Sequence, residues 1–306
     1  MAQPLPQPNQ PLLDVLHVSG LTVAELNQML ADGAQEIERL IPKLLEKHTT
    51  GGQIKAAQLA LVRKELHVVQ AALWGDLGRV LRSGVGQAVE TAASGGLDLL
   101  TSVLGKNHVP LPGWRDALVA QAKAGIDAVL AKAKNGIPLA RSVYKTQALT
   151  QGMVDRKVSQ GLLLGHNAKT IAKSVKDMIR PDVAGGVSYA AHRLARTEIN
   201  HAYQTAQATR HEGEPWTKGM RWNLSKSHPK PDVCNVNAET NWAGLGAGVY
   251  TFGNKPDSHP NCLCYQTPET VDEDEFEEQF LAGEYNAYID EKLYTYAPQA
   301  VKLPCR

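Results

Sequence analysis

The sequence is poor in aromatic side chains and contains no long apolar run. Phenylalanine, tryptophan and tyrosine make up 6% of its 306 residues, whereas alanine, leucine and glycine are abundant. This composition favours helices packed through small side chains over a sandwich with an aromatic core. No stretch approaches the roughly 20 apolar residues that a membrane-spanning helix needs. We therefore expect an ordinary globular protein with no membrane partner.

Two sequence signals of common protein classes are also absent. The N-terminal residues MAQPLPQPNQPLLD lack the basic start and apolar core of a signal peptide. The glycine-rich segment Gly244-Leu245-Gly246-Ala247-Gly248 lacks a following Gly-Lys-Ser/Thr and does not lie between a strand and a helix. It is therefore not interpreted as a phosphate-binding loop. We expect its glycines to form tight turns.

The near-neutral net charge of +1 hides two charged segments of opposite sign. Residues 115–180 hold 12 Lys/Arg and 4 Asp/Glu, and residues 269–291 hold 10 Asp/Glu and no Lys or Arg. Such segments are informative about partners and not about fold. The basic segment is either a solvated helix face or a contact for packaged double-stranded DNA or an acidic protein. The acidic segment either keeps the protein soluble or docks onto a basic partner.

The patterning predicts a mainly α protein in which a long helical N-terminal region precedes a small α+β, loop-rich, metal-stabilised module. Residues 1–20, which begin with a stretch rich in proline and glutamine, are expected to form an extended arm. The helical region spans residues 21–184 and includes the basic segment 115–180. The module spans residues 185–268, and residues 269–306 form an acidic and then tyrosine-rich tail.

Several helix boundaries can be predicted within this scheme. A helix is expected to begin at Thr22, which forms a capping-box pattern with Glu25, and to kink or break at Pro42. The clearest apolar stripe at helical spacing runs through residues 59–80. Residues 188–211 are expected to form one further long helix. Four glycines are expected to loosen the stretch after residue 80: Gly84, Gly86, Gly95 and Gly96.

The composition changes sharply after this last helix, from about Trp216 to Gln266. This part is rich in Trp, Tyr, Gly, Pro, His and Cys and has little helical periodicity. Residues 220–224 and 249–252 are the predicted strands. Small, loop-rich modules bury little apolar surface and often need a metal or a scaffold to fold.

The residues that could provide a metal site lie in this module. His259, Cys262 and Cys264 fall within six residues, and His228 and Cys234 precede them by about 30 residues. A structural zinc ion prefers four such ligands in a tetrahedron. Cys234, Cys262, Cys264 and either His228 or His259 would suffice. The alternatives are three reduced, partly buried thiols, or a disulfide between Cys234 and Cys262 or Cys264.

An ordered series of short motifs surrounds these ligands. In chain order they are Leu194-Ala195-Arg196-Thr197-Glu198-Ile199-Asn200-His201-Ala202-Tyr203, Lys218-Gly219-Met220-Arg221-Trp222, Ser227-His228-Pro229, Asp232-Val233-Cys234, Gly244-Leu245-Gly246-Ala247-Gly248-Val249-Tyr250 and His259-Pro260-Asn261-Cys262-Leu263-Cys264. Over roughly residues 185–268 this series resembles the phage Mu F-like head morphogenesis family of minor capsid, or minor head, proteins. Many members carry Cys-x-x-Cys where this chain has Cys234-Asn235-Val236-Asn237. The second thiol is missing here, so a histidine would have to complete the metal shell.

The resemblance implies a virion protein that acts in head assembly and in DNA packaging or delivery, and that is not an enzyme. The implied partners are the portal protein and the major capsid protein, with packaged double-stranded DNA as a candidate for the basic segment 115–180. The implied location is the head interior or the vicinity of the portal, and the host cytoplasm during assembly. The implied cofactor is a structural zinc ion.

A metal-dependent hydrolase or nuclease that uses His228, Asp232, His259 and the thiols is the alternative. Hydrolytic metal sites usually combine histidine with carboxylates and keep one position open. Three cysteine ligands favour a closed structural site instead. The sequence therefore favours the assembly protein over the enzyme.

Arg196 and Glu198 form the last candidate pair. Residues two apart on a helix do not face each other, so these side chains cannot pair within the helix. Glu198 lies four residues from both Leu194 and Ala202, on an apolar face where a carboxylate needs a partner from elsewhere. We expect the pair to clamp the helix to the module, with a general-base role for Glu198 as the alternative.

Overall fold

A computed structural model describes residues 10–49, 56–103, 139–180, 186–226, 228, 230–288 and 291 of the chain. The chain divides into two compact units. The helical unit comprises Ser19–Gly84 and Lys134–Glu198, and the sheet unit comprises Met1–Val18, Val85–Ala133 and Ile199–Arg306. Each unit is described by itself.

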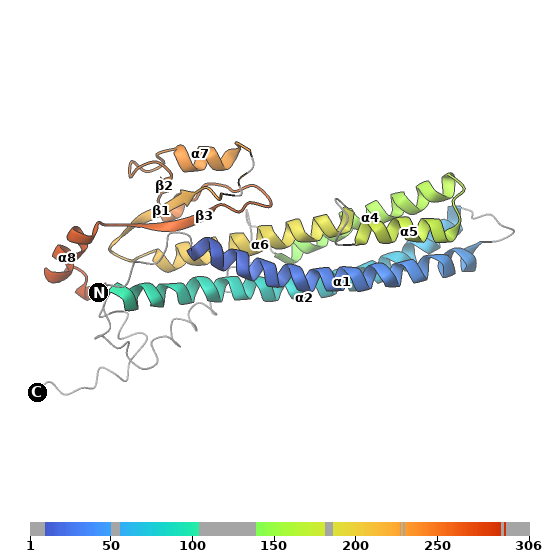
Figure 1. The fold of residues 1–306 in the computed structure, drawn as a ribbon, viewed down its shortest axis with the longest axis horizontal. Helices are drawn as coiled ribbons and strands as arrows, with labels where there is room; N and C mark the ends of the chain where they lie inside the picture. Colours follow the sequence, from blue (N-terminus) through green and yellow to red (C-terminus); the bar gives the residue numbers. More distant parts are fainter. Residues whose placement is uncertain are drawn as a thin grey trace, which may run out of the picture. The chain divides into compact units, whose positions relative to one another are not determined.

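Five long helices account for most of the described residues, which confirms the expected mainly α fold (Figure 1). They are α1 (Gln10–His48), α2 (Ala56–Val103), α4 (Leu139–Leu163), α5 (Ala168–Ile179) and α6 (Gly186–His211). The basic segment is helical where it is described, because α4 and α5 cover most of residues 139–180. None of the described helices is both long and apolar enough to cross a membrane.

The core of the helical unit consists of aliphatic side chains that recur at helical spacing. Its fully buried members on α1 include Leu26, Leu30, Ile37 and Ile41. Leu66 and Leu77 of α2, Val154 and Val158 of α4 and Ile171 and Val175 of α5 complete its centre. The apolar stripe predicted in residues 59–80 is thus a packing face, because burial of these side chains is what holds α2 against its neighbours.

A row of polar pairs fixes how α2 and α4 align. The three pairs are Arg63 with Ser159, His67 with Asp155 and Trp74 with Thr150. As the residue number rises on α2 it falls on α4, so the helices run antiparallel. Buried polar groups must find hydrogen-bond partners, and shifting one helix by a turn would leave these groups unpaired.

The long helices continue through several positions at which the sequence predicts a boundary or an interruption. Residues 10–20, predicted as extended, belong to α1, and the predicted start at Thr22 lies inside that helix. Pro42 is accommodated within α1, since one lost backbone hydrogen bond is offset by burial of Ile41 and Leu44 on either side. Likewise α2 continues through its four glycines to Val103. Residues 1–9 and 104–138 lie outside the described part.

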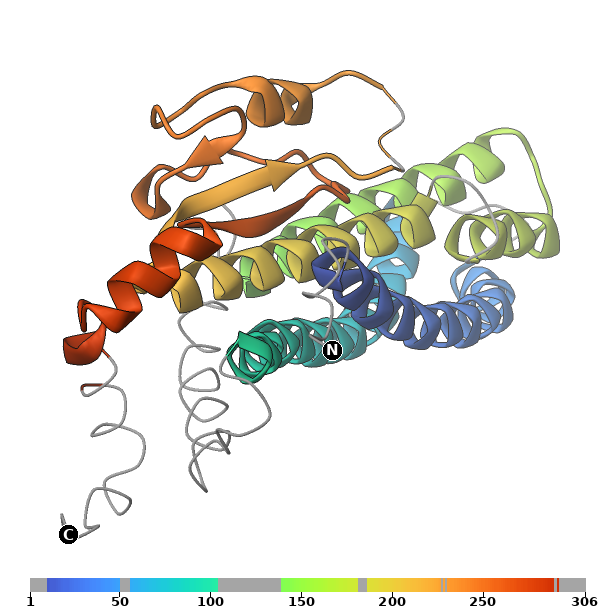
Figure 2. The ribbon, with the colours of Figure 1, turned by 60° about the vertical axis from the view of Figure 1, so that its left-hand side comes forward.

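The sheet unit contains a three-stranded antiparallel sheet in the order β2-β1-β3. Its strands are β1 (Thr217–Asn223), β2 (Val249–Tyr250) and β3 (Tyr265–Thr270). The short helix α7 (Val233–Glu239) covers one face of the sheet, and the second half of α6 covers the other (Figures 1 and 2). The 3-10 turn η2 (Phe252–Asn254) follows β2, and α8 (Glu273–Leu281) follows β3.

The strand predictions are confirmed in part. The strand at 220–224 corresponds to β1, and the strand at 249–252 is shortened to β2. Neither α7 nor β3 was predicted, and the expected boundary at residue 268 falls inside β3. Residues 269 and 270 are therefore sheet and not tail. The acidic segment then forms α8.

An aromatic cluster holds α8 against the start of β1. The ring of Trp216 lies edge-on to those of Phe276, Tyr285 and Tyr288, with centroids 5.8, 5.4 and 5.2 Å away. Tyr285 and Tyr288 of the tail are thus packing anchors within the chain. Tyr294 and Tyr296 of the same tail lie outside the described residues.

Candidate metal centre

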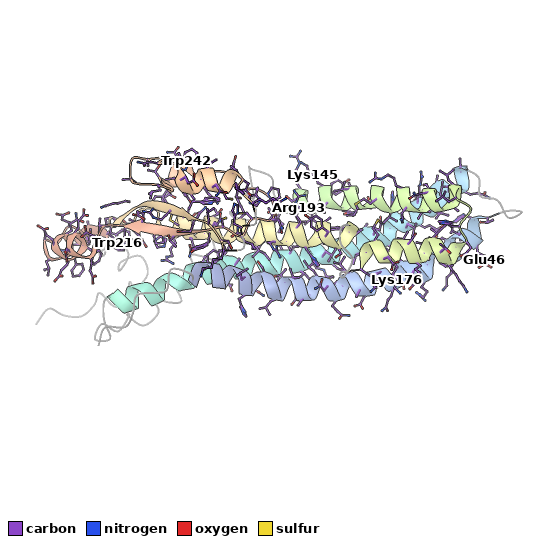
Figure 3. The ribbon with its side chains drawn as sticks, turned by 45° about the horizontal axis from the view of Figure 1, so that its top comes forward. Glu46, Lys145, Lys176, Arg193, Trp216 and Trp242 are labelled. Atoms are coloured by element: carbon purple, nitrogen blue, oxygen red, sulfur yellow. The ribbon has the colours of Figure 1, made fainter. Side chains whose placement is uncertain are left out.

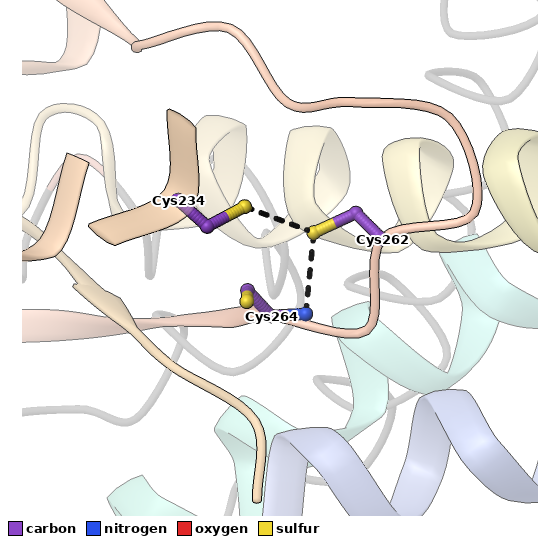
Figure 4. A group of neighbouring side chains, drawn as sticks. All are labelled: Cys234, Cys262 and Cys264. Carbon is purple, nitrogen blue, oxygen red and sulfur yellow. Dashed lines mark hydrogen bonds between the residues drawn. The ribbon is translucent and has the colours of Figure 1, made fainter. Parts of the chain in front are cut away.

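Three cysteines converge in the sheet unit although 28 residues separate the first from the second. Cys234, Cys262 and Cys264 are 0, 2 and 1% exposed, and all three are reduced. Their Sγ atoms lie within 4.8 Å of one another, and those of Cys234 and Cys262 are 3.5 Å apart (Figure 4). The disulfide alternative is absent from the structure, and the expected cluster of these three residues is present.

The start of α7 positions Cys234. Asp232 is the N-cap residue, and its carboxylate accepts a hydrogen bond of 2.7 Å from the backbone N–H of Cys234. Asn235 completes a capping box by accepting a 3.0 Å hydrogen bond from the Asp232 N–H. Such a box fixes the first turn of a helix. Here the first turn directs Cys234 into the core.

The turn before β3 positions the other two cysteines. Asn261 adopts a φ of 67°, a left-handed conformation that asparagine tolerates better than most residues. The chain then folds so that the Cys264 N–H lies 3.3 Å from Cys262 Sγ. This backbone donor opposes the contacts that raise the pKa of the Cys262 thiol.

The second half of α6 holds this turn in place. We call it the cysteine turn, because it carries Cys262 and Cys264. Asn200 Nδ2 donates to the carbonyl oxygens of Cys262 and Cys264 at 3.0 and 3.2 Å. Gln204, one helical turn later, donates from Nε2 to the Cys264 carbonyl at 2.8 Å. Both side chains are buried. Since the two side chains lie four residues apart on one helix face, they reach the same short loop.

His228 lies at the edge of the cysteine group. Its Nδ1 is 3.9 Å from Cys264 Sγ, and its Nε2 is 2.8 Å from the side-chain oxygen of Asn235. That amide oxygen only accepts hydrogen bonds, so Nε2 carries the proton. Nδ1 is the ring nitrogen on the side of Cys264, and hydrogen bonding to Asn235 raises the pKa of His228.

His259 is placed differently. Its Nδ1 is 2.9 Å from the carbonyl oxygen of Pro260, and its Nε2 is 3.1 Å from Asp232 Oδ2. His228, Asp232 and His259 form a second group whose ligand atoms lie within 4.8 Å of one another. This group is partly exposed, whereas the cysteines are buried.

The electrostatics of the thiols favour a single thiolate at Cys264. Hydrogen bonds from the Cys234 and Cys262 thiols, together with a backbone donor and the charge of His228, lower the Cys264 pKa. The same contacts raise the pKa of Cys234, and contact with Cys264 together with burial raises that of Cys262. Three adjacent buried thiolates would repel one another. A divalent cation at their centre would remove that repulsion.

Each of the two groups could hold a metal ion. Soft thiolates select zinc and similar metals, and mixed imidazole and carboxylate groups suit a wider range. In a tetrahedral zinc site with Zn–S bonds of about 2.3 Å, sulfur atoms lie about 3.8 Å apart. The 3.5 Å between the Sγ atoms of Cys234 and Cys262 is close to that separation. His228 approaches Cys264 at 3.9 Å but is grouped with Asp232 and His259 and not with all three sulfurs.

The predicted clamp residues lie on α6 before the part that contacts the cysteine turn. Glu198 is buried and Arg196 is half-buried, and their role as a clamp stays a prediction. The described contacts to the cysteine turn come from Asn200 and Gln204, which sequence reasoning missed. The signal was present, because these two polar residues stand four apart and so share one helix face.

Asn237 occupies the position at which the second thiol of a Cys-x-x-Cys pair would stand. Its side chain is 2% exposed and donates from Nδ2 to the Asp257 carbonyl at 2.8 Å. Its backbone oxygen accepts a 3.2 Å hydrogen bond from Trp242. The asparagine therefore joins α7 to the loop before His259, and is not among the clustered ligands.

The chain matches no family model, and neither a curated protein nor a solved structure is significantly similar to it.

Proposed function

We propose that the sheet unit is a zinc-stabilised module of an assembly protein, and that the chain is a minor head protein of a tailed bacteriophage. One observation carries the proposal. Motifs spread from α6 to Cys264 converge on one buried group of soft ligands, docked on α6 by Asn200 and Gln204. The order of those motifs is that of the Mu F-like head morphogenesis proteins.

The zinc ligands in this proposal are Cys234, Cys262, Cys264 and His228. His228 is favoured over His259 because its Nδ1 lies 3.9 Å from Cys264 Sγ, while His259 faces Asp232. The bond to Asn235 sets the His228 tautomer, as outer partners of metal-bound histidines commonly do. A bound zinc ion would neutralise the thiolates and cross-link α7 to the turn before β3.

Burial of the ligands supports an assembly role over catalysis. A hydrolytic metal needs an open coordination position that substrate can reach. With the three cysteines no more than 2% exposed, a metal they hold would be closed to substrate. The proposed location is the virion, in the head interior or near the portal. The proposed partners are the portal protein and the major capsid protein, with packaged DNA at the basic segment 115–180.

The second group favours a second candidate function. His228, Asp232 and His259 combine imidazole and carboxylate ligands and are partly exposed, as a metal-dependent hydrolase or nuclease would require. Loss of a hydrolytic activity on Asp232→Asn, with zinc content unchanged, would favour this candidate.

Elemental analysis and sedimentation test the proposal. Purified protein should contain about one equivalent of zinc, and Cys234→Ser should remove most of it. Cys305→Ser is the matched control, since it replaces the one cysteine of the sequence that the proposal does not use as a ligand. The protein should co-sediment with proheads or isolated portal. A zinc content near zero would refute the metal site, and absence from both particles would refute the assembly role.

A further inference from the structure

The outward face of α4 combines positive charge with exposed apolar side chains. Arg141, Lys145 and Leu149 follow one another at steps of four residues, so they share one face of the helix. Arg141 and Lys145 are exposed, and Leu149 is 58% exposed. Figure 3 shows the Lys145 side chain extending away from α4. Arg156 and Leu163 continue this face toward the end of the helix.

In the part that the structure describes, α4 and α5 carry no acidic side chain that lacks a basic partner within the chain. The two acidic residues of these helices are Asp155 and Asp177, and each already has a basic partner. Asp155 contacts His67 at 2.9 Å, and Asp177 lies 3.7 Å from Arg180. The outward face of α4 is thus a basic surface with leucines in it.

The outward face of α8 has the opposite charge at the same spacing. Glu273, Glu277 and Leu281 follow one another at steps of four, and all three are exposed, Leu281 by 76%. The inward face is occupied, because Phe276 packs on Trp216. Glu275 is already paired with Lys218 within the chain. The negative charges of α8 that can meet a second molecule are therefore those of its outward face.

We propose that the outward face of α4 in one copy of this chain binds the outward face of α8 in a second copy. Aligned in parallel, the two triplets place Glu273 beside Arg141, Glu277 beside Lys145 and Leu281 beside Leu149. Each triplet spans about 12 Å of helix, so the three contacts form together. Opposite charges would set the register and the leucines would bury apolar surface.

The contact joins two different surfaces of the chain. It either forms twice within a two-fold dimer, with each α4 on the α8 of the other copy, or repeats head to tail into a ring or an open filament. The inference goes beyond the proposed function and does not depend on the zinc site. The exposed leucines favour a protein occupant over duplex DNA, whose phosphates would contact the basic side chains and leave the leucines exposed.

Charge reversal in the full-length protein tests the contact. One variant carries Arg141→Glu and Lys145→Glu, and the other carries Glu273→Lys and Glu277→Lys. In sedimentation at about 0.05 M salt, wild-type protein should self-associate and lose this on raising the salt to about 0.5 M. Each variant alone should associate at least tenfold more weakly. An equimolar mixture of the two should recover association, because the reversed faces now complement each other.

The controls separate this contact from general charge effects and from misfolding. Lys43→Glu with Lys64→Glu changes the net charge equally at exposed sites on α1 and α2, and should leave self-association within twofold of wild type. The neutral pair Arg141→Gln and Lys145→Gln should weaken association less than reversal does. A wild-type protein that stays monomeric, or a mixture that does not recover association, overturns the proposal. So does loss of duplex DNA binding in the Arg141/Lys145 variant with self-association unchanged.

Discussion

At the scale of single residues, the sheet unit depends on buried polar side chains that each satisfy several partners. Asn200 is one, since its amide group donates to two carbonyl oxygens of the cysteine turn and accepts from Gln204. An apolar residue at this position would leave the Cys262 carbonyl without this donor. Such a residue adds little to the free energy of unfolding while all its hydrogen bonds are made. Removing it lowers that free energy more, because a buried polar group then loses its partner.

Replacement of Asn200 by alanine should therefore destabilise the protein by about 1–3 kcal/mol. The physical reason is the unpaired buried carbonyl oxygen of Cys262. Urea unfolding followed by tryptophan fluorescence would measure the change. Asn254→Ala is the matched control, because Asn254 is exposed and bonds only locally to Thr251. Equal effects of the two substitutions would contradict the role given to Asn200.

A second residue-scale feature is a buried pair at the end of α6. Burial lowers the pKa of His211, whose Nδ1 is 2.6 Å from Glu214 Oε2. Burial alone would raise the pKa of Glu214, but hydrogen bonds from His211 and Thr217 and the charge of Arg210 outweigh it and lower that pKa. Both groups thus hold fewer protons in the folded than in the unfolded chain at acid pH.

Stability should consequently fall on acidification. A depressed pKa means that unfolding takes up a proton, so the free energy of unfolding decreases as the pH drops below the ordinary histidine value of 6.5. Melting temperatures at pH 7.5 and 5.5 would measure this. The loss should be smaller in His211→Gln and unchanged in His166→Gln, where an exposed histidine is replaced. An equal loss in all three proteins would contradict the assignment.

At the scale of elements, α7 is tied to the sheet through backbone contacts at a glycine. The Gly248 N–H donates to the Thr240 carbonyl at 2.9 Å, and its carbonyl accepts from Trp222 at 2.9 Å. Its φ is +74°, and an added Cβ would lie 2.8 Å from the Ala238 carbonyl oxygen. A side chain here would separate α7 from β1.

Gly248→Ala should lower stability by several kcal/mol, more than Gly244→Ala, which should cost about 1–2 kcal/mol. Gly244 is a close control because it has the same φ of +74° but open space around the added Cβ. The difference between the two variants therefore isolates the clash with α7. Thermal unfolding of the purified variants measures both, and equal losses would show that conformation alone matters.

The capping box of α7 also has a consequence for the metal. Asn235 accepts hydrogen bonds from both the Asp232 N–H and His228. Asn235→Ala should weaken zinc binding about 10–100-fold, the usual effect of losing an outer partner of a ligating histidine. Competition with a chromophoric chelator would measure it. Asn241→Ala is the control, since Asn241 bonds to Gly246 instead, and an equal loss there would contradict the assignment.

At the scale of the whole molecule, the two units have different sources of stability. The helical unit has a continuous aliphatic core, with side chains from α1, α2, α4, α5 and α6. The cysteine module, which comprises β1, α7, β2 and β3 of the sheet unit, has a smaller core. This core consists of Met220, Trp222, Tyr250 and the three cysteines. A module with so few apolar side chains is expected to depend on the metal ion that we propose for it.

Removal of zinc should therefore unfold the cysteine module and spare the helical unit. After chelation, hydrogen exchange should lose protection in β1, α7 and β3 while the buried core positions of α1 keep theirs. Far-ultraviolet circular dichroism should retain most of its helical signal. An equal loss of protection in α1, or none in the strands, would contradict this division.

Much of the helical architecture is predictable from the sequence because its signal is local. Apolar residues at steps of three and four predicted the stripe in α2, and α6 was predicted within two residues at its start. The interruptions were overpredicted, since the burial around Pro42 depends on neighbouring helices and not on local preference. The short elements were missed. β3 contains Pro268, which only an edge strand tolerates, and α7 has only seven residues.

The candidate site also has one part that the sequence predicts and another that only the folded structure shows. The sequence by itself determined that Cys234, Cys262, Cys264 and a histidine form the ligand candidates, because their chemistry is a property of residue type. Only the tertiary structure showed that His228 and not His259 contacts a thiol of the group, and that Asn200 and Gln204 hold the cysteine turn. The reason is physical. Residue type and periodicity act over a few positions, whereas contacts across about 60 residues exist only once the chain has folded.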